Sequence, residues 1–141
     1  MKNHIVQLNT EEDTVAFAKK IAAQLPKKCV MFLKGDLGAG KTTFVRYLLH
    51  ALAYKGSVKS PTFTLVEPYE FDDWRVFHFD LYRIHSPLEL DYIGIQDYFA
   101  QEAVCLIEWP ERAQTLLPPP DYLLEMELLS DGARRCLVKT L

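Results

Sequence analysis

The first part of the chain alternates a short apolar run with apolar side chains at helical spacing. Residues 4–9 (HIVQLN) predict a short strand. A helix start follows, in which Thr10 is the cap and Asp13 supplies a carboxylate three residues later. Pro26 ends this helix, whose apolar face is formed by Val15, Ala18, Ile21, Ala22 and Leu25.

The middle of the chain predicts buried strands around a second helix. Residues 29–34 (CVMFLK) form an apolar run that ends at Gly35, which is typical of a buried strand. An amphipathic helix begins at Lys41, with its apolar face formed by Phe44, Val45, Leu48, Leu49 and Leu52. Residues 62–71 and 75–80 then predict two strands, joined by a turn at the two aspartates between them.

The last part of the chain predicts one more helix, a buried strand and a hairpin. Ser86 starts a helix as its cap, with Pro87 at the first helical position, and we expect this helix to run to about residue 100. Residues 103–107 (AVCLI) predict a buried strand, and 122–129 and 134–140 predict a hairpin. Strands alternating with helices indicate an α/β fold with a mostly parallel sheet and antiparallel additions, built as one domain over residues 1–141.

Composition narrows the class of protein. Hydrophobic residues make up 49% of the 141 residues, which excludes a disordered chain. No stretch without a charged side chain exceeds eight residues, far below the roughly 20 that a membrane-spanning helix needs. The N-terminus lacks a signal-peptide pattern, so we expect a cytoplasmic protein that has no membrane partner. The three cysteines each lie among apolar residues, which predicts buried thiols. The net charge of −3 argues against nucleic-acid binding through broad charge attraction.

The strongest chemical signal is the segment Gly35-Asp36-Leu37-Gly38-Ala39-Gly40-Lys41-Thr42, which matches the phosphate-binding pattern G-x-x-x-x-G-K-[ST] in full. Its glycines let the backbone curl so that several amides converge on one anion, and the following helix adds its N-terminal N–H groups. Lys41 supplies a point charge for the β- and γ-phosphates, and the Thr42 hydroxyl is a hard oxygen ligand for Mg²⁺. Thr43 offers a further hydroxyl towards the α-phosphate.

A phosphate loop also requires an acid near the metal, and two apolar strands end in one. They are VFHFD, which ends at Asp80, and AVCLIE, which ends at Glu108. We favour Glu108 as the acid on the Mg²⁺ side or as the residue that polarises the attacking water. Asp80 then acts on the metal through water or as the base, although the two roles could be exchanged.

Two residues beside these acids have either a functional or a structural role. Arg83 has a functional role if it neutralises charge on the γ-phosphate or binds a partner. It has a structural role if it forms a salt bridge with Asp80 or Glu89. Trp109 precedes a proline, which favours an extended backbone, and its ring either packs over the site, anchors a partner or lies in the core.

Four motifs taken together resemble the TsaE (YjeE) family. They are the loop GDLGAGKTT, the segment Ser60-Pro61-Thr62-Phe63-Thr64, the run His78-Phe79-Asp80-Leu81-Tyr82-Arg83, and Ile107-Glu108-Trp109-Pro110. The family comprises small P-loop ATPases of the bacterial system that makes threonylcarbamoyladenosine (t6A) at position 37 of certain tRNAs. The resemblance covers nearly the whole chain and implies a P-loop NTPase-like three-layer fold with ATP and Mg²⁺ as cofactors.

The resemblance also implies roles for individual residues. Thr42 and Glu108 would be Mg²⁺ ligands, Asp80 would belong to the catalytic cluster with Lys41, and residues 38–43 would wrap the phosphates. Residues 60–64, with Ser60 and Thr62, would form a switch-like loop, and Tyr82, Arg83 and Trp109 would contact it or a partner. The adenine would lie near Thr10, Glu11 and either Arg134 or Arg135. The family's partners are TsaB and TsaD, so tRNA would be reached only through that complex.

Two other readings of the same residues remain. A small P-loop kinase would transfer the γ-phosphoryl group to a metabolite, but such enzymes usually carry a lid with arginines, and the arginines here are scattered. A nucleotide-dependent binding module would hydrolyse ATP only incidentally. The scarcity of convergent cations predicts slow intrinsic hydrolysis that partner docking accelerates.

Overall fold

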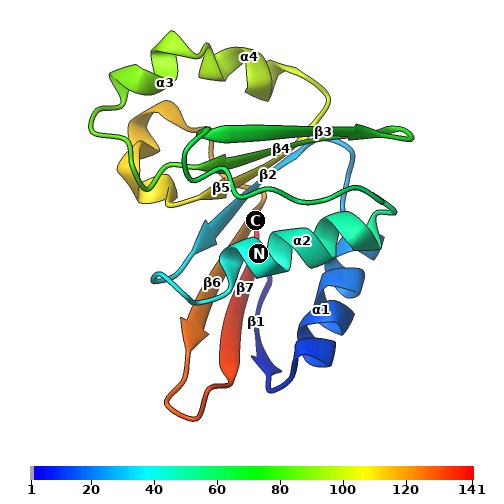
Figure 1. Ribbon diagram of the computed structural model, residues 1–141. Helices are drawn as coiled ribbons and strands as arrows, with labels where there is room; N and C mark the ends of the chain where they lie inside the picture. Colours follow the sequence, from blue (N-terminus) through cyan, green and yellow to red (C-terminus); the bar gives the residue numbers. More distant parts are fainter. Residues whose placement is uncertain (1) are drawn as a thin grey trace.

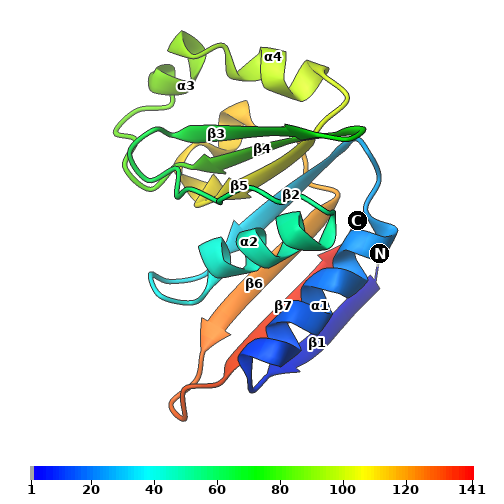
Figure 2. The ribbon, with the colours of Figure 1, turned by 45° about the vertical axis from the view of Figure 1, so that its right-hand side comes forward.

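One mixed sheet of seven strands runs through the computed structural model, which describes residues 2–141 (Figures 1 and 2). The strand order across the sheet is β1-β7-β6-β2-β5-β4-β3. The strands are β1 (Lys2–Leu8), β2 (Cys29–Lys34), β3 (Val66–Phe71), β4 (Trp74–Asp80), β5 (Val104–Glu108), β6 (Tyr122–Leu128) and β7 (Arg134–Thr140).

The four central strands, β6, β2, β5 and β4, are mutually parallel. The outer strands β3, β7 and β1 each pair antiparallel with a neighbour. This arrangement confirms the predicted α/β fold with antiparallel additions. It also explains the apolar run of β2, because this strand has neighbours on both sides and side chains packed on both faces.

Helices cover the sheet from both sides and make the fold three-layered (Figure 1). On one side lie α1 (Glu11–Gln24) and α2 (Lys41–Ala51), which close an apolar core that includes Ile21, Phe44 and Leu106. On the other side lie α3 (Leu88–Tyr92) and α4 (Ile95–Ala100), with the 3-10 turns η1 (Pro110–Arg112) and η2 (Gln114–Leu116). They close a second core built around Phe79 and Ile107.

The start of α1 confirms its predicted capping box. The Thr10 hydroxyl accepts the Asp13 N–H at 3.1 Å, and the Asp13 carboxylate accepts the Thr10 N–H at 3.1 Å. Three acidic side chains in the first turn also favour the positive end of the helix dipole.

Most predicted bounds agree with the structure to within two residues, but two elements differ more. The strand predicted over 62–71 begins only at Val66, because Leu65 has a φ of 74° and its N–H is bonded to Pro61 O at 2.8 Å in a turn. The helix predicted to run to residue 100 is interrupted at Gly94, whose φ of 70° is incompatible with a continuous right-handed helix. The helix also begins one residue later than predicted, at Leu88 with Pro87 in the cap position, although Ser86 Oγ accepts the Leu88 N–H and Glu89 accepts the Ser86 N–H.

The three cysteine side chains are buried, as predicted. Burial raises the pKa of each thiol from 9.0 to about 12. Across residues 2–141, every helix is too short or too polar to cross a membrane.

Candidate functional site

The phosphate-loop segment connects the central strand β2 to α2, and its glycines adopt backbone conformations that other residues avoid. Gly35, Gly38 and Gly40 have φ values of 147°, 82° and 103°. A Cβ at Gly35 would lie 2.5 Å from the Met126 carbonyl oxygen, whereas one at Gly38 would meet no atom within 4 Å. The first glycine of the motif is therefore required by packing against β6, and Gly38 lies open at the cavity.

Lys41 is the first residue of α2, and its exposed fraction is 5%. Its ammonium group donates a hydrogen bond to the Gly35 carbonyl and lies 3.8 Å from the centre of the Trp109 ring. Burial lowers the pKa of Lys41, and the negative charges of Glu108 and Asp80 oppose this effect. The protein thus holds a desolvated cation at the start of the helix, where an anion would bind.

Asp80 and Glu108 lie side by side at the carboxyl ends of β4 and β5, where they are partners in the parallel register. They are 7% and 3% exposed. The Thr42 hydroxyl donates to Glu108 Oε2 at 2.9 Å, which brings two hard oxygen ligands together next to Lys41. A carboxylate and a hydroxyl in this arrangement fit the ligand preference of Mg²⁺.

Asp80 connects the site to the segment 60–64. Its Oδ1 accepts the Tyr82 N–H at 3.0 Å, and its Oδ2 accepts the Thr62 hydroxyl at 3.3 Å. The Ser60 hydroxyl lies 2.7 Å from that of Thr62. The two acids therefore differ in their neighbours, since Glu108 contacts the phosphate loop and Asp80 contacts the segment 60–64.

The backbone prediction for Trp109 is wrong, because this residue has a φ of 59° and a ψ of 49° rather than an extended conformation. It caps η1, where its carbonyl accepts the Arg112 N–H at 3.1 Å. Its ring packs against Lys41 and against the Tyr82 ring, with 4.8 Å between the ring centres. The ring therefore packs over the site, where it forms part of the lining of a cavity.

Arg83 lies outside this cluster. Its guanidinium stacks over the exposed Phe63 ring at 4.6 Å. Among the described residues it forms no ion pair with Asp80 or Glu89. The Arg83 side chain therefore lies on the exposed side of the segment 60–64.

A cavity of about 310 Å³ collects most of the predicted site residues. It is lined by Leu37, Gly38, Gly40, Lys41, Thr42, Thr43, Thr62, Asp80, Glu108, Trp109 and Arg134. Predicted site residues that do not form part of this lining include Gly35, Ala39, Ser60, Tyr82 and Arg83. Sequence patterns from five separate segments thus meet at one edge of the sheet.

The residues predicted near adenine divide into two groups. Arg134 lines the cavity and donates from Nε to the Ala39 carbonyl at 3.0 Å, whereas Arg135 is on the opposite face, paired with Glu127. Thr10 and Glu11 are outside the cavity lining. Thr10 caps α1, and Glu11 accepts a hydrogen bond from the Tyr47 hydroxyl.

His78 is a neighbour of the site that our sequence reasoning did not select. It is fully buried, and its Nε2 lies 2.6 Å from Glu108 Oε2. The signal was present in the run VFHFD, because alternate residues of a strand face the same side and His78 therefore shares a face with Asp80.

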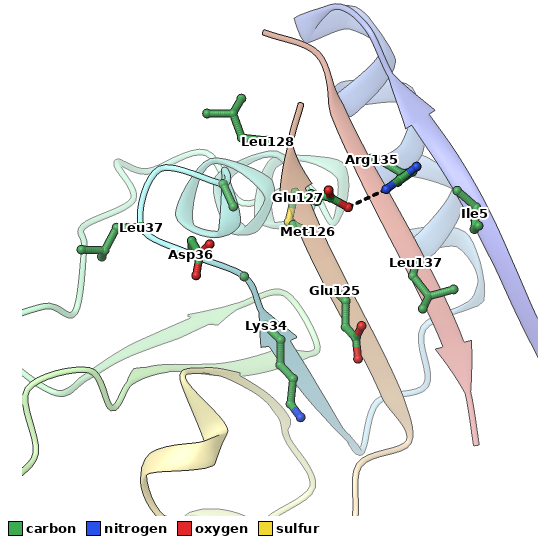
Figure 3. A pocket seen from close by; sticks show the side chains of 12 residues that line it. Ile5, Lys34, Asp36, Leu37, Glu125, Met126, Glu127, Leu128, Arg135 and Leu137 are labelled. Carbon is green, nitrogen blue, oxygen red and sulfur yellow. Dashed lines mark hydrogen bonds and ion pairs between the residues drawn. The ribbon is translucent and has the colours of Figure 1, made fainter. Parts of the chain in front are cut away.

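A second and larger cavity, of about 970 Å³, lies on the sheet face opposite α1 and α2 (Figure 3). Side chains of Lys34, Glu125 and Leu137 project from β2, β6 and β7 into it, and Arg135 pairs with Glu127 at 2.7 Å. Its charges are mixed and partly paired, so it lacks the convergence of cations that a polyphosphate requires. The smaller cavity meets this requirement better, because Lys41 lies in it beside the phosphate loop.

The fold and the loop geometry place this chain in the P-loop class of α/β proteins, with the phosphate loop after a central parallel strand and acids at the ends of two neighbouring strands. Comparison with known proteins refines this class. The family model described as threonylcarbamoyl adenosine biosynthesis protein TsaE matches residues 8–136. The chain belongs to the TsaE family.

Individual relatives agree with this assignment. The Haemophilus influenzae tRNA threonylcarbamoyladenosine biosynthesis protein TsaE is 46% identical over 127 residues, which cover 86% of this chain and 80% of that protein. The Aquifex aeolicus protein of the same name is 43% identical over 132 residues, covering 92% and 91%. The crystal structure of Bacillus subtilis YdiB superposes with a TM-score of 0.84 at 29% identity, covering 99% of this chain and 86% of that one.

Proposed function

We propose that this chain is the ATP-binding and ATP-hydrolysing subunit of the machinery that makes t6A in tRNA, and that it acts through a TsaB–TsaD complex. The observation that carries the proposal is the convergence of Lys41, Thr42, Asp80 and Glu108 on one cavity beside a glycine-rich loop. Family membership and the names of the relatives support the pathway.

The residues of the cavity fit ATP and Mg²⁺. The positive-φ backbone at Gly38 and Gly40 and the first amides of α2 would surround the phosphates, and Lys41 would exchange its bond to the Gly35 carbonyl for phosphate oxygens. Thr42 and Glu108 would hold Mg²⁺, which when bound neutralises charge on the β- and γ-phosphates. Arg134, anchored on the Ala39 carbonyl, would border the nucleotide on the β7 side.

The two acids have different roles in this proposal. Glu108 serves the metal side, because its Oε2 is already bonded to the Thr42 hydroxyl. Asp80 serves the attacking water and the segment 60–64, because Thr62 donates to it. Movement of that segment would therefore change the hydrogen bonds of a catalytic carboxylate, which gives residues 60–64 a switch-like role.

Intrinsic hydrolysis should be slow, because few cations reach the site. Among the described residues that line the cavity, the cations are Lys41 and Arg134, and the latter is bonded to loop carbonyls. Arg83 and Arg112 instead lie over aromatic rings outside the lining. Phosphoryl transfer depends on positioned charge, so docking of the partner would supply or redirect the missing stabilisation.

The test is ATP hydrolysis measured with and without purified TsaB–TsaD, with Lys41→Ala as the inactive control. We expect slow Mg²⁺-dependent turnover by the chain alone and an increase of about tenfold or more with the partners. Equal rates with and without the partners would refute the partner-stimulated function. ADP release that depends on an added phosphoryl acceptor would indicate a kinase instead.

A further inference from the structure

His78 occupies a position in the sheet where packing alone favours an apolar side chain. It lies on β4 with 0% exposure, and its neighbours along the strand, Phe77 and Phe79, are buried apolar residues. Its register partner on β5 is the fully buried Leu106. Burial of an imidazole in such surroundings is unfavourable unless its polar atoms are bonded.

One of the two ring nitrogens is bonded and the other is not. Nε2 lies 2.6 Å from Glu108 Oε2, whereas Nδ1 has no hydrogen-bond partner among residues 2–141. Because a carboxylate accepts, Nε2 carries the proton and donates it to Glu108. The polar ring is therefore retained for one interaction, the bond to Glu108.

The sheet geometry makes this contact direct. Asp80 is the register partner of Glu108, and His78 lies two residues before Asp80, so His78 and Glu108 are diagonal neighbours on the same face of β4 and β5. Glu108 Oε2 thus receives two donors from different directions, the His78 ring within the sheet and the Thr42 hydroxyl on α2. Two such bonds restrict rotation of the carboxylate.

We propose that His78 is a positioning residue that orients the Glu108 carboxylate towards the metal and phosphate side of the cavity. This inference rests on the proposed function, because it assigns His78 to the site at which ATP and Mg²⁺ would bind. His78 acts through Glu108 and does not touch the nucleotide. Ligating carboxylates generally depend on hydrogen bonds of this kind, and loss of the partner typically lowers metal affinity or activity by about 10–100-fold.

Three substitutions separate the hydrogen bond from the packing. His78→Gln places an amide N–H close to the position of Nε2 and can still donate to Glu108. His78→Asn ends near the position of Nδ1, and His78→Leu fills a similar volume without a donor. Phe77→Leu, on the opposite face of β4, is the matched control for a change in core packing.

Each purified variant is assayed for ATP hydrolysis with TsaB–TsaD, for binding of Mn²⁺ by electron paramagnetic resonance with a non-hydrolysable ATP analogue, and for thermal stability. We expect His78→Leu and His78→Asn to lower kcat and Mn²⁺ affinity by about 10–100-fold, with little change in the affinity for metal-free nucleotide. His78→Gln should restore most of both quantities. Phe77→Leu should lower the melting temperature and leave kcat unchanged.

Two results would overturn the inference. One is wild-type kcat and Mn²⁺ affinity in His78→Leu. The other is a folded His78→Gln that is as impaired as His78→Asn, since a donor at the Nε2 position would then be irrelevant. Absence of ATPase in the wild-type chain with its partners would instead refute the proposed function, and Mn²⁺ affinity would still report on the orientation of Glu108.

Discussion

Replacement of Gly35 by alanine should destabilise the fold through a backbone contact, in addition to any effect on ligand binding. Gly35 follows β2, next to β6, and the added Cβ would lie 2.5 Å from the Met126 carbonyl oxygen and 3.2 Å from the Ala39 Cβ. Backbone atoms of a paired strand cannot rotate away as a side chain can. The φ of 147° is also a region that residues with a Cβ avoid.

The expected loss of stability combines the cost of the unfavourable φ with the cost of the steric contact. A residue held in such a region costs roughly 1–3 kcal/mol, and forced overpacking costs a similar amount, so we expect a loss of about 3 kcal/mol in the free energy of unfolding. For 141 residues the entropy of unfolding is about 0.3 kcal/mol/K, so the melting temperature should fall by about 10 °C.

Gly38→Ala is the matched control in the same loop. Its φ of 82° is also unfavourable for alanine, but no atom lies within 4 Å of the added Cβ. We expect a loss of about 1 kcal/mol and a fall of about 3 °C. Gly132→Ala, in the hairpin turn with a φ of 87° and open space, should behave in the same way without affecting the phosphate loop.

The assay is thermal unfolding followed by circular dichroism, without nucleotide, for the wild-type protein and the three variants. Equal melting temperatures for Gly35→Ala and Gly38→Ala would refute the reasoning, because they differ mainly in the contact with β6. A folded, stable Gly35→Ala would mean that the loop and β6 separate at little cost.

Four further predictions concern the site and the core. Lys41→Ala should weaken ATP binding by about 10–100-fold in a fluorescent-nucleotide titration, as expected for loss of a charged hydrogen bond, while Lys34→Ala at the other cavity leaves it unchanged. Glu108→Ala should bind ATP and lose hydrolysis, and full activity would leave Asp80 as the essential acid. Trp109→Ala should reduce the partner-stimulated rate more than nucleotide affinity, and an unchanged stimulated rate would assign the ring to packing alone. The cysteine thiols should resist a thiol reagent at pH 8 until the chain is unfolded. Rapid labelling of the native protein would contradict the burial of these thiols. The folded-state pKa of the thiols is about 12, above the ordinary 9.0, so the folded state holds more protons than the unfolded state between these pH values. The free energy of unfolding, measured by urea titration, should therefore fall as the pH rises above 9.

Local sequence was sufficient for features that depend on neighbouring residues. The capping box at Thr10 and Asp13 was predictable because its hydrogen bonds join residues three apart in the chain. The buried strand 29–34 was predictable from its apolar run. Element ends were less predictable, as Leu65 and Gly94 show, because a turn and a left-handed residue interrupt patterns that would otherwise continue.

The candidate site was predictable as separate pieces. The phosphate loop is contiguous, so its pattern predicts its own conformation and place between strand and helix. Asp80 and Glu108 could be expected at one edge because both follow parallel strands, and the register confirms that they are neighbours. Their different hydrogen-bond partners, Thr62 for one and Thr42 for the other, come from segments distant in the chain.

The sequence by itself therefore determined the α/β class, the phosphate loop and the acids at the strand ends, because each of these is encoded in short-range spacing. Only the tertiary structure decided which of Arg134 and Arg135 lines the cavity, since adjacent residues of a strand face opposite sides and the side that meets the loop depends on sheet order. It likewise decided the left-handed backbone of Trp109 and the contact of His78 with Glu108. These last features arise from packing between elements that are far apart along the chain, which no local pattern records.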